Sequence, residues 1–322
     1  MSCQTVSIAL ATYNGALNLP DQLQSYVGQT RLPDEVVICD DGSSDDTRAI
    51  LTEFSKTAPF PVRIFYNDNN LGYTRNFEKA LGKCSGDIIF LSDQDDIWYP
   101  EKIDIIKKTF DERRDDLLII HDGDLVGQDI NCQVTKRGQI ISGYGSDDTF
   151  ITGALTALRK ELLLYAMPFP DGIVGHDGWL HSVAGLLQRR SVLKCSLQRI
   201  NRHESNTSAW VASSTVPINK ADVFKSQVSQ KAATSYQDRL LYNAALSERI
   251  NFIASRFEDA ISKDDYFFIR SMLEKERVAI LERERLVNSG FFLRRCRAIK
   301  MLMLGFYSHF NGIKSFARDM LR

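Results

Sequence analysis

The chain has 322 residues, of which 43% are hydrophobic and 25% are charged, and its formal net charge is -1. This composition is typical of a globular protein with one large domain and a smaller addition, and the near-neutral charge argues against nucleic-acid binding over the whole surface. The six cysteines are scattered, without zinc-ligand spacing or the density of a disulfide framework, which favours reduced thiols in a cytosolic protein.

The N-terminal sequence MSCQTVSIALATYNG lacks the basic start and the long apolar run of a secretion signal. No apolar segment approaches the length of a membrane span. We therefore expect a cytoplasmic protein.

Short β-branched runs alternate with helical segments over the first hundred residues. The runs predict strands at Val6–Ala11, Glu35–Asp40, Val62–Tyr66 and Asp87–Ser92. Between them, residues 44–58 and 73–84 place apolar side chains at helical spacing. Strands joined by helices in this order predict an α/β fold with a mainly parallel sheet flanked by helices.

A polar cluster follows three of these strands: ATYNG the first, DDGSSDD the second and SDQDD the fourth. Each cluster alone is equally well explained as a solvated turn. Because ligands of open α/β sheets bind beyond the carboxyl ends of the strands, we expect the three clusters to meet at one edge. Their joint position indicates a binding site.

The acids of the third cluster, Asp93, Asp95 and Asp96, lie within four residues and repel one another unless a cation compensates them. Mg2+ or Mn2+ is typically held by one or two carboxylates, with phosphate oxygens in other positions. The chain has no GxxxxGK[ST] loop, and no GxGxxG motif follows the first strand. The acids therefore suggest a nucleotide diphosphate that binds through a divalent cation.

The pattern loosens after residue 110. Leu117–Asp122 predicts a further strand, residues 150–163 a strand that runs into a helix, and residues 176–190 an amphipathic helix. From about Thr215 the chain changes to long, charge-rich helical segments. We place a domain boundary there, with a catalytic domain at residues 1–214 and a helical region at 215–322.

Seven motifs occur in a characteristic order: VSIALATYNG, VVICDDGSSDDT, NLGYTRNFEKAL, GDIIFLSDQDDIW, TGALTALRKEL, PFPDGIVGHDGW and NRHESN. Together they resemble the family 2 glycosyltransferases with a GT-A fold, over about residues 4–210. Within that family the resemblance favours the bacterial rhamnosyltransferase-like branch, which acts on cell-surface polysaccharides.

The resemblance implies roles for individual residues. SDQDD is similar to the DXD motif, and GHDGW stands where the family has its catalytic base, Asp177 here. NRHESN departs from the usual form of its motif, although Arg202 and His203 would still contact the diphosphate or the metal. The implied nucleotide-sugar-binding residues are Thr12, Tyr13, Asn14, Asp40, Asp41, Asn76, Asp93 and Arg202, and the implied metal ligands are Asp93, Asp95 and His203.

The implied activity is that of an inverting, metal-dependent glycosyltransferase. It would move a sugar, rhamnose in this branch, from a UDP- or dTDP-linked donor to a surface glycan such as O-antigen, or to a lipid-linked oligosaccharide. Two alternatives stay open. A sugar nucleotidyltransferase would need a glycine-rich, basic loop near the N-terminus, which is missing, and a catalytically silent nucleotide-sugar-binding scaffold would not need both Asp95 and Asp177.

Three residues near the implied base have two interpretations each. Trp179 either stacks under a sugar or anchors its helix in the core. Gly153 either lets an acceptor approach closely or forms a tight turn. His176 is expected to shape the base rather than to bind metal with His181, since the two do not share a helix face.

The last 32 residues, 291–322, predict a basic amphipathic helix. Apolar side chains at spacings of four and three form one stripe, and basic side chains fall on a neighbouring face. This pattern is typical of a helix on the anionic inner face of the plasma membrane, and equally of a helix that packs on protein. The stripe consists of Ile299, Met303, Phe306, Phe310, Ile313, Ala317 and Met320, and the basic face of Arg297, Lys300, Lys314, Arg318 and Arg322.

Overall fold

The computed structural model describes residues 4–126, 134–143, 145–201, 214–220 and 235–321. The chain forms two compact units, Met1–Lys231 and Ala232–Arg322. Residues 214–218 belong to the first unit, where Gln139 donates hydrogen bonds to the carbonyls of Ser214 and Val216. The boundary between residues 214 and 215 stays a prediction.

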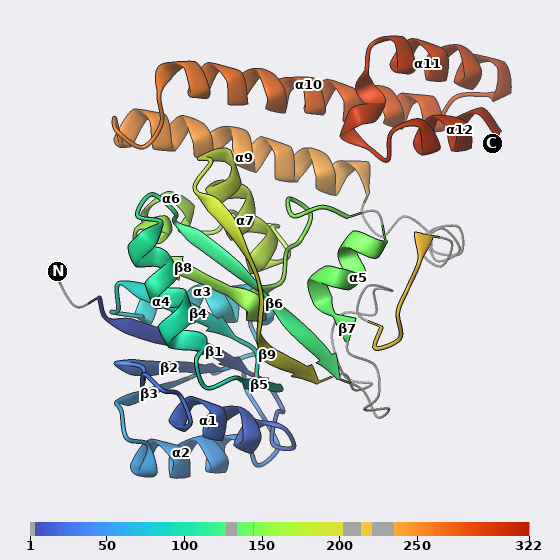
Figure 1. Ribbon diagram of the computed structural model, residues 1–322. Helices are drawn as coiled ribbons and strands as arrows, with labels where there is room; N and C mark the ends of the chain where they lie inside the picture. The colour runs from blue at the N-terminus through green and yellow to red at the C-terminus, as the bar shows by residue number, and fades with distance from the viewer. Residues whose placement is uncertain (1–3, 127–133, 144, 202–213, 221–234, 322) are drawn as a thin grey trace. The chain divides into compact units, whose positions relative to one another are not determined.

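The first unit is built on one sheet, with the strand order β3-β2-β1-β4-β8-β6-β9-β5 and β7 paired to β6 (Figure 1). Strands β1 to β4 pair in parallel, and so do β6 and β9. Strand β8 lies antiparallel between β4 and β6, so β6 and β9 run in the direction of β1. The strands are β1 (Val6–Thr12), β2 (Glu35–Asp40), β3 (Val62–Tyr66), β4 (Ile88–Ser92), β5 (Asp96–Trp98), β6 (Leu118–Val126), β7 (Val134–Thr135), β8 (Thr156–Arg159) and β9 (Arg190–Asn201).

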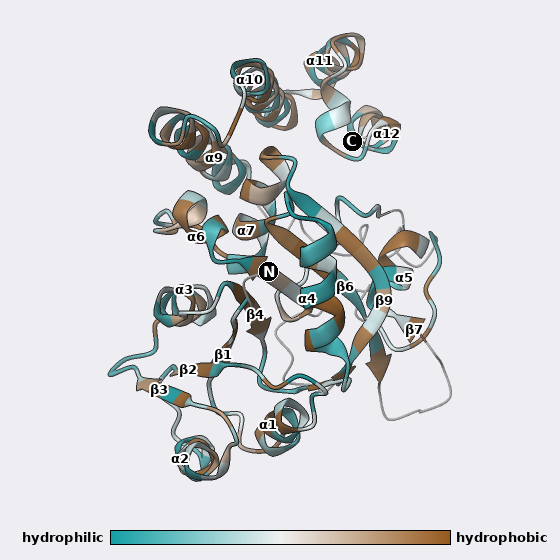
Figure 2. Cartoon of the chain, turned by 60° about the vertical axis from the view of Figure 1, so that its left-hand side comes forward, coloured by the Kyte–Doolittle hydropathy of each residue, from teal (hydrophilic) through white to brown (hydrophobic). Residues whose placement is uncertain are grey.

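Helices cover both faces of this sheet; Figure 2 shows α3 on one side of the first four strands and α1 on the other. Side chains of α1, α2 and α4 pack on Ile8, Ile38 and Phe90 in one apolar core. Complete burial of each such side chain contributes about 1.5–3 kcal/mol. The helices of this unit are α1 (Leu19–Val27), α2 (Thr47–Thr57), α3 (Tyr73–Lys83), α4 (Lys102–Glu112), α5 (Lys136–Ser142), α6 (Glu161–Ala166) and α7 (His176–Leu186), with a short 3₁₀ helix, η1 (Gly153–Leu155).

The predicted α/β fold with a mainly parallel sheet is confirmed. Two predicted strands coincide with β2 and β3, and β1 and β4 differ from the prediction by one residue at one end. Strand β6 continues through Val126, beyond the predicted end at Asp122. The three residues of β5 were too few to show a pattern, and they become a strand because they pair with β9.

The second unit is entirely helical in the part that the structure describes, as predicted. Its helices are α9 (Tyr236–Arg256), α10 (Lys263–Val287), α11 (Phe291–Met303), the 3₁₀ helix η3 (Phe306–His309) and α12 (Ile313–Leu321). Ser235 and Ser262 cap the first two helices by accepting backbone hydrogen bonds from Asp238 and Asp265. None of the described helices is long and apolar enough to cross a membrane.

The predicted single stripe along the C-terminal helix is wrong. Gly305 and Gly312 adopt left-handed backbone conformations, with φ of 69° and 56°, which separate α11, η3 and α12. Phe306, Phe310 and Met320 pack inward on a small core formed by Leu286, Ala298, Met301 and Tyr307. In contrast, Met303 and Ile313 are 82% and 65% exposed. The helical spacing in the sequence continues across Gly305 and Gly312, where the helix is interrupted. Residues at that spacing therefore do not share one face of a single helix.

Candidate active site

The loops that follow β1, β2 and β4 are tied together by hydrogen bonds, as expected from the parallel sheet. The backbone NH of Tyr13 donates to the Gln94 side chain at 2.9 Å, and the Gln94 amide donates to the Tyr13 carbonyl at 3.0 Å. The side chain of Asn14 accepts from the Ser44 NH at 2.8 Å. The three polar clusters therefore meet at one edge of the sheet.

Gly15 allows this close approach. A Cβ atom at Gly15 would lie 2.3 Å from the Gln94 side-chain oxygen, well inside any normal contact. The NH of Gly15 donates to the Thr47 hydroxyl at 2.8 Å, which fixes the first loop against the start of α2. A side chain at this position would displace Gln94 from the hydrogen bonds that join the two loops.

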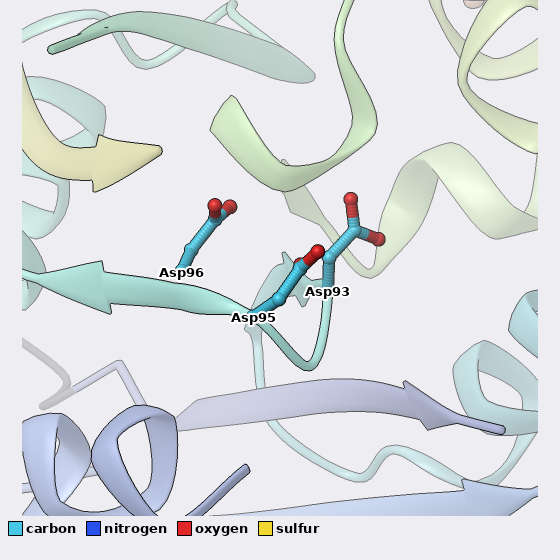
Figure 3. A group of neighbouring side chains, drawn as sticks. All are labelled: Asp93, Asp95 and Asp96. Atoms are coloured by element: carbon cyan, nitrogen blue, oxygen red, sulfur yellow. The ribbon is translucent and has the colours of Figure 1, made fainter. Parts of the chain in front are cut away.

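The three acids of the third cluster form the centre of the site (Figure 3). Asp93 and Asp95 lie on the turn between β4 and β5, and Asp96 is the first residue of β5. One carboxylate oxygen from each lies within 4.8 Å of the others. Burial and repulsion from Asp95 and Asp177 raise the pKa of Asp93 to about 7, and burial raises the pKa of Asp96 well above its usual range.

This donor set fits a hard divalent cation. A doubly charged ion would stabilise the ionised forms of Asp93 and Asp96, whose pKa values are raised, and carboxylate oxygen is the donor that Mg2+ and Mn2+ prefer. Asp96 is already held by the Gln198 amide, which donates to it at 2.6 Å. Asp93, Asp95 and Asp96 could each offer a carboxylate oxygen to such an ion.

A buried lysine behind the acids is a residue that the sequence analysis missed. Lys102 is completely buried, and its Nζ lies 3.7 Å from the centroid of the Trp98 ring. It donates to the Gln198 oxygen at 2.5 Å, so Gln198 links it to Asp96. Helical spacing could have found it, because Lys102 precedes the buried Ile106 by four residues on the same face of α4.

Asp177 lies in the first turn of α7, which begins at His176. Its negative charge contributes to the raised pKa of Asp93, so the two carboxylates lie near one another although 84 positions separate them. One oxygen of Asp177 accepts a hydrogen bond from the Gly178 NH at 2.8 Å. The tertiary structure thus brings the predicted base to the acidic cluster.

His176 and Gly153 position the start of α7. The His176 ring is buried and stacks on Phe77 of α3 with centroids 3.9 Å apart. Burial lowers the pKa of His176 to about 4, so the ring is neutral, and neither ring nitrogen has a hydrogen-bond partner among the described residues. A Cβ at Gly153 would lie 2.7 Å from His176 Nε2, so Gly153 is needed for packing against this ring.

Trp179 belongs to the core. It is completely buried, and its indole NH donates to the Ala166 carbonyl at 2.8 Å. The alternative that it stacks under a sugar is wrong, because no face of the ring is accessible. His181 hydrogen-bonds Thr156 and Arg190, which leaves no ring nitrogen for a metal.

Several implied nucleotide-binding residues are engaged inside the protein. The Thr12 hydroxyl donates to Asp40 at 3.1 Å, and Asp40 also accepts from Arg48 at 2.9 Å. Asp41 accepts from the backbone NH groups of Leu71 and Gly72 at 2.8 and 2.9 Å. These carboxylates shape the loops around the edge of the sheet, and any contact with a ligand would add to these bonds.

Both polar atoms of the Asn76 side chain are also hydrogen-bonded inside the protein. Its amide donates to the Cys39 carbonyl at 2.8 Å, and its oxygen accepts from Asn67 at 3.0 Å. Tyr13, in contrast, is half exposed. Arg202 and His203 lie outside the described residues; β9 ends at Asn201, whose side chain donates to the Asp95 carbonyl at 2.9 Å.

Comparison with known proteins gives this site a family context. Residues 7–126 match the model of the family described as Glycosyl transferase family 2. The chain is 25% identical over 259 residues to an uncharacterized glycosyltransferase of Nostoc, alr2836, covering 76% of this chain and 78% of that protein. It is 28% identical over 170 residues to the Escherichia coli UDP-Glc:alpha-D-GlcNAc-diphosphoundecaprenol beta-1,3-glucosyltransferase WfgD, covering 51% of this chain and 64% of WfgD.

A shorter match, 37% identical over 98 residues, covers 29% of this chain and 34% of the Shigella flexneri dTDP-rhamnosyl transferase RfbG. Among solved structures, S. aureus TarS 1-349 in complex with UDP-GlcNAc aligns with a TM-score of 0.53 at 16% identity, covering 98% of this chain and 90% of that one. The mannosyltransferase PcManGT from Pyrobaculum calidifontis, in complex with GDP-Man and Mn2+, aligns with a TM-score of 0.52 at 17% identity, covering 84% of each chain. These structures support the GT-A-like fold.

Proposed function

We propose that this chain, whose residues 7–126 carry a family 2 glycosyl transferase sequence, moves a sugar from a nucleotide-diphosphate donor to a bacterial glycan or lipid-linked acceptor. One observation carries the proposal. Asp177 lies close enough to Asp93 to raise its pKa, which supports a single site with Asp177 as the base and Asp93, Asp95 and Asp96 as metal-binding acids.

At the donor end, Asp93 and Asp95 would hold Mn2+ or Mg2+, with Asp96 and Gln198 orienting them. A bound cation would supply charge stabilisation to the diphosphate as it leaves. The half-exposed Tyr13 lies on the loop beside Gln94, where a nucleoside would be contacted. The Mn2+ in the structurally similar mannosyltransferase supports the choice of metal.

At the acceptor end, the Asp177 carboxylate would take the proton of the acceptor hydroxyl while the oxygen attacks the anomeric carbon. The bond from that carbon to the diphosphate breaks in the same step, through an oxocarbenium-like state. One base and one leaving group on opposite sides of the sugar give a single displacement with inversion.

For the donor, we propose a hexose linked to UDP or dTDP, and we propose rhamnose as the specific sugar. WfgD uses UDP-Glc and a diphosphoundecaprenol-linked acceptor by its name, and RfbG transfers rhamnose from dTDP. These names support a role in surface polysaccharide synthesis. The acceptor would then be a lipid-linked oligosaccharide or a growing O-antigen-type glycan.

Nucleotide binding tests the proposal most directly. Thermal melting of the full chain with UDP, dTDP, GDP and UTP, each with and without Mn2+, should show stabilisation by UDP or dTDP that requires the metal. A diphosphate at one hundred times its Kd would stabilise the fold by about 2.7 kcal/mol. A clear preference for the triphosphate would instead indicate a nucleotidyltransferase, and no nucleotide effect would indicate a silent scaffold.

Asp95→Asn should abolish metal-dependent nucleotide binding while the fold survives, because it removes the charge of a proposed metal ligand that lies half-buried on the turn after β4. Isothermal calorimetry with UDP or dTDP and Mn2+ measures the effect. Asp115→Asn, at an exposed position before β6, is the matched control and should bind normally. Equal affinity and equal metal dependence in both variants would remove Asp95 from the metal site.

A further inference from the structure

Helix α11 exposes an apolar stripe on the side opposite its packed face. Ala298 and Met301 are buried in the small core of the second unit. Phe292, Ile299 and Met303 are 83%, 46% and 82% exposed, and the exposed Cys296 completes a spacing of four, three and four residues. With 3.6 residues per turn, these four side chains form one line about half a turn from the packed residues.

The charge around this stripe has one sign. The sequence has no acidic residue from Arg285 to Arg318. On α11, Arg295 and Lys300 fall on the two sides of the exposed line, and the Arg295 guanidinium lies 3.4 Å from the centroid of the Phe291 ring. A line of apolar side chains with basic residues on both sides is complementary to a surface that has an apolar interior and negative charges at its boundary with water.

We propose that this outer face of α11 binds an anionic lipid surface. Phe292, Ile299 and Met303 would enter the boundary between head groups and acyl chains, while Arg295 and Lys300 would lie at the lipid phosphates. Two copies of this chain would bring like charges together at the same stripe, so self-association through this face is disfavoured.

The proposed binding face contains fewer residues than the stripe predicted from the sequence. Phe306, Phe310 and Met320 are partly buried and pack against the inner core rather than facing outward. Ile313 is exposed on α12, beyond the break at Gly312, and is not part of the α11 line. Binding through α11 and binding through a single stripe along residues 299–320 therefore predict different effects of the same substitutions on vesicle binding. It does not rest on the glycosyl transfer proposed above.

Co-sedimentation of the full chain with vesicles tests the proposal. The chain should bind vesicles of phosphatidylcholine with phosphatidylglycerol at low salt, bind less at high salt, and bind poorly to phosphatidylcholine alone. Phe292→Ser and Met303→Ser should each weaken binding by about tenfold, because each removes one inserted apolar side chain. Arg295→Gln with Lys300→Gln should weaken binding only to the anionic vesicles.

Two control variants distinguish vesicle binding through this face from nonspecific binding by any exposed apolar side chain. Phe267→Ser removes an equally large side chain, 67% exposed on α10, and should bind as the unchanged protein does. Ile313→Ser should also bind normally, whereas the single-stripe alternative predicts a loss. Because Phe292, Met303, Phe267 and Ile313 are exposed, the melting temperatures of these four variants should stay the same and report intact folding.

Failure to bind anionic vesicles at low salt would overturn the proposal, as would equal binding by Phe292→Ser and Phe267→Ser. Gel filtration supplies a further outcome that would contradict it. A dimer that dissociates in Met303→Ser would show that the face joins two copies of the chain. Retention on an acidic protein surface without any vesicle binding would assign the face to a protein partner.

Discussion

Lys102 places a buried amino group near Asp96 and Asp93, and Gln198 links it to Asp96. Burial lowers the pKa of Lys102, and the charges of Asp96 and Asp93 act against that shift. The Trp98 ring and the Gln198 oxygen replace the water that the ammonium would otherwise bind. The acidic cluster is therefore partly compensated by the protein itself, and a bound metal adds to this compensation.

Lys102→Met should lower the free energy of unfolding by about 1 to 3 kcal/mol, since it leaves the buried oxygen of Gln198 without its hydrogen-bond donor. Urea unfolding at pH 7 measures the loss. Lys108→Met on the same helix is the control, because the Lys108 side chain is 79% exposed and its ion pair with Glu112 is a surface pair. Similar losses in both variants would show that Lys102 is an ordinary helix lysine.

At the scale of elements, Glu35 holds the amino ends of four parallel strands together. It is the first residue of β2, and it accepts hydrogen bonds from Ser7 of β1 at 2.6 Å and from Arg63 of β3 at 2.6 Å. It also accepts from the NH of Ser85, before β4, at 2.6 Å. The opposite edge of these strands carries the candidate site, so this clamp fixes the strands that position the acids.

Burial raises the pKa of Glu35, but the hydrogen bonds from Ser7, Ser85 and Arg63 outweigh burial and lower it to about 2. A carboxylate with a lowered pKa stabilises the fold above its unfolded pKa, and the contribution is lost as pH falls from about 4.5 to 2. The shift corresponds to about 3 kcal/mol at neutral pH.

Glu35→Gln should therefore be less stable than the unchanged protein by about 3 kcal/mol at pH 7, with the difference shrinking below pH 4.5. Urea unfolding between pH 7 and pH 3 measures it. Glu112→Gln, at an exposed position on α4, serves as the control and should show no such trend. A pH-independent difference would mean that Glu35 acts through packing rather than through its charge.

At the scale of the whole molecule, folding assembles the candidate site from distant parts of the first unit. The acids follow β4, while Asp177 is the second residue of α7, and the first residue of that helix, His176, stacks on Phe77 of α3. Gln198 comes from β9 and Lys102 from α4. No local segment contains both Asp177 and the three acids that follow β4.

Asp177→Asn keeps the size of the side chain but cannot accept the acceptor's proton, so sugar transfer should fall by about 100- to 10,000-fold. Donor binding should stay near normal. Transfer assays with saturating donor and acceptor, alongside calorimetry with the nucleotide, measure the two quantities. Asp171→Asn is the control, because Asp171 is fully exposed on the preceding loop and pairs only with Arg75 among the described residues.

Unchanged transfer in Asp177→Asn would exclude it as the base. Loss of donor binding would instead place Asp177 among the metal or nucleotide ligands, and the roles of the two acidic motifs would have to be exchanged. Either result would leave the nucleotide-binding test of Asp95 intact, since that test does not depend on the acceptor.

The sequence by itself determined the first four strands, the clustering of polar residues at their carboxyl ends and the helical nature of the C-terminal region. Buried parallel strands leave continuous apolar runs, and the topology of such sheets puts their loops at one edge. Only the tertiary structure decided which polar groups serve the fold: Asp41 and Asn76 are already hydrogen-bonded, whereas Lys102 and Gln198 support the acids. It also decided that Gly305 and Gly312 break the final stripe. Spacing reports which side chains share a face of one element, and it cannot report the partners that only long-range packing supplies.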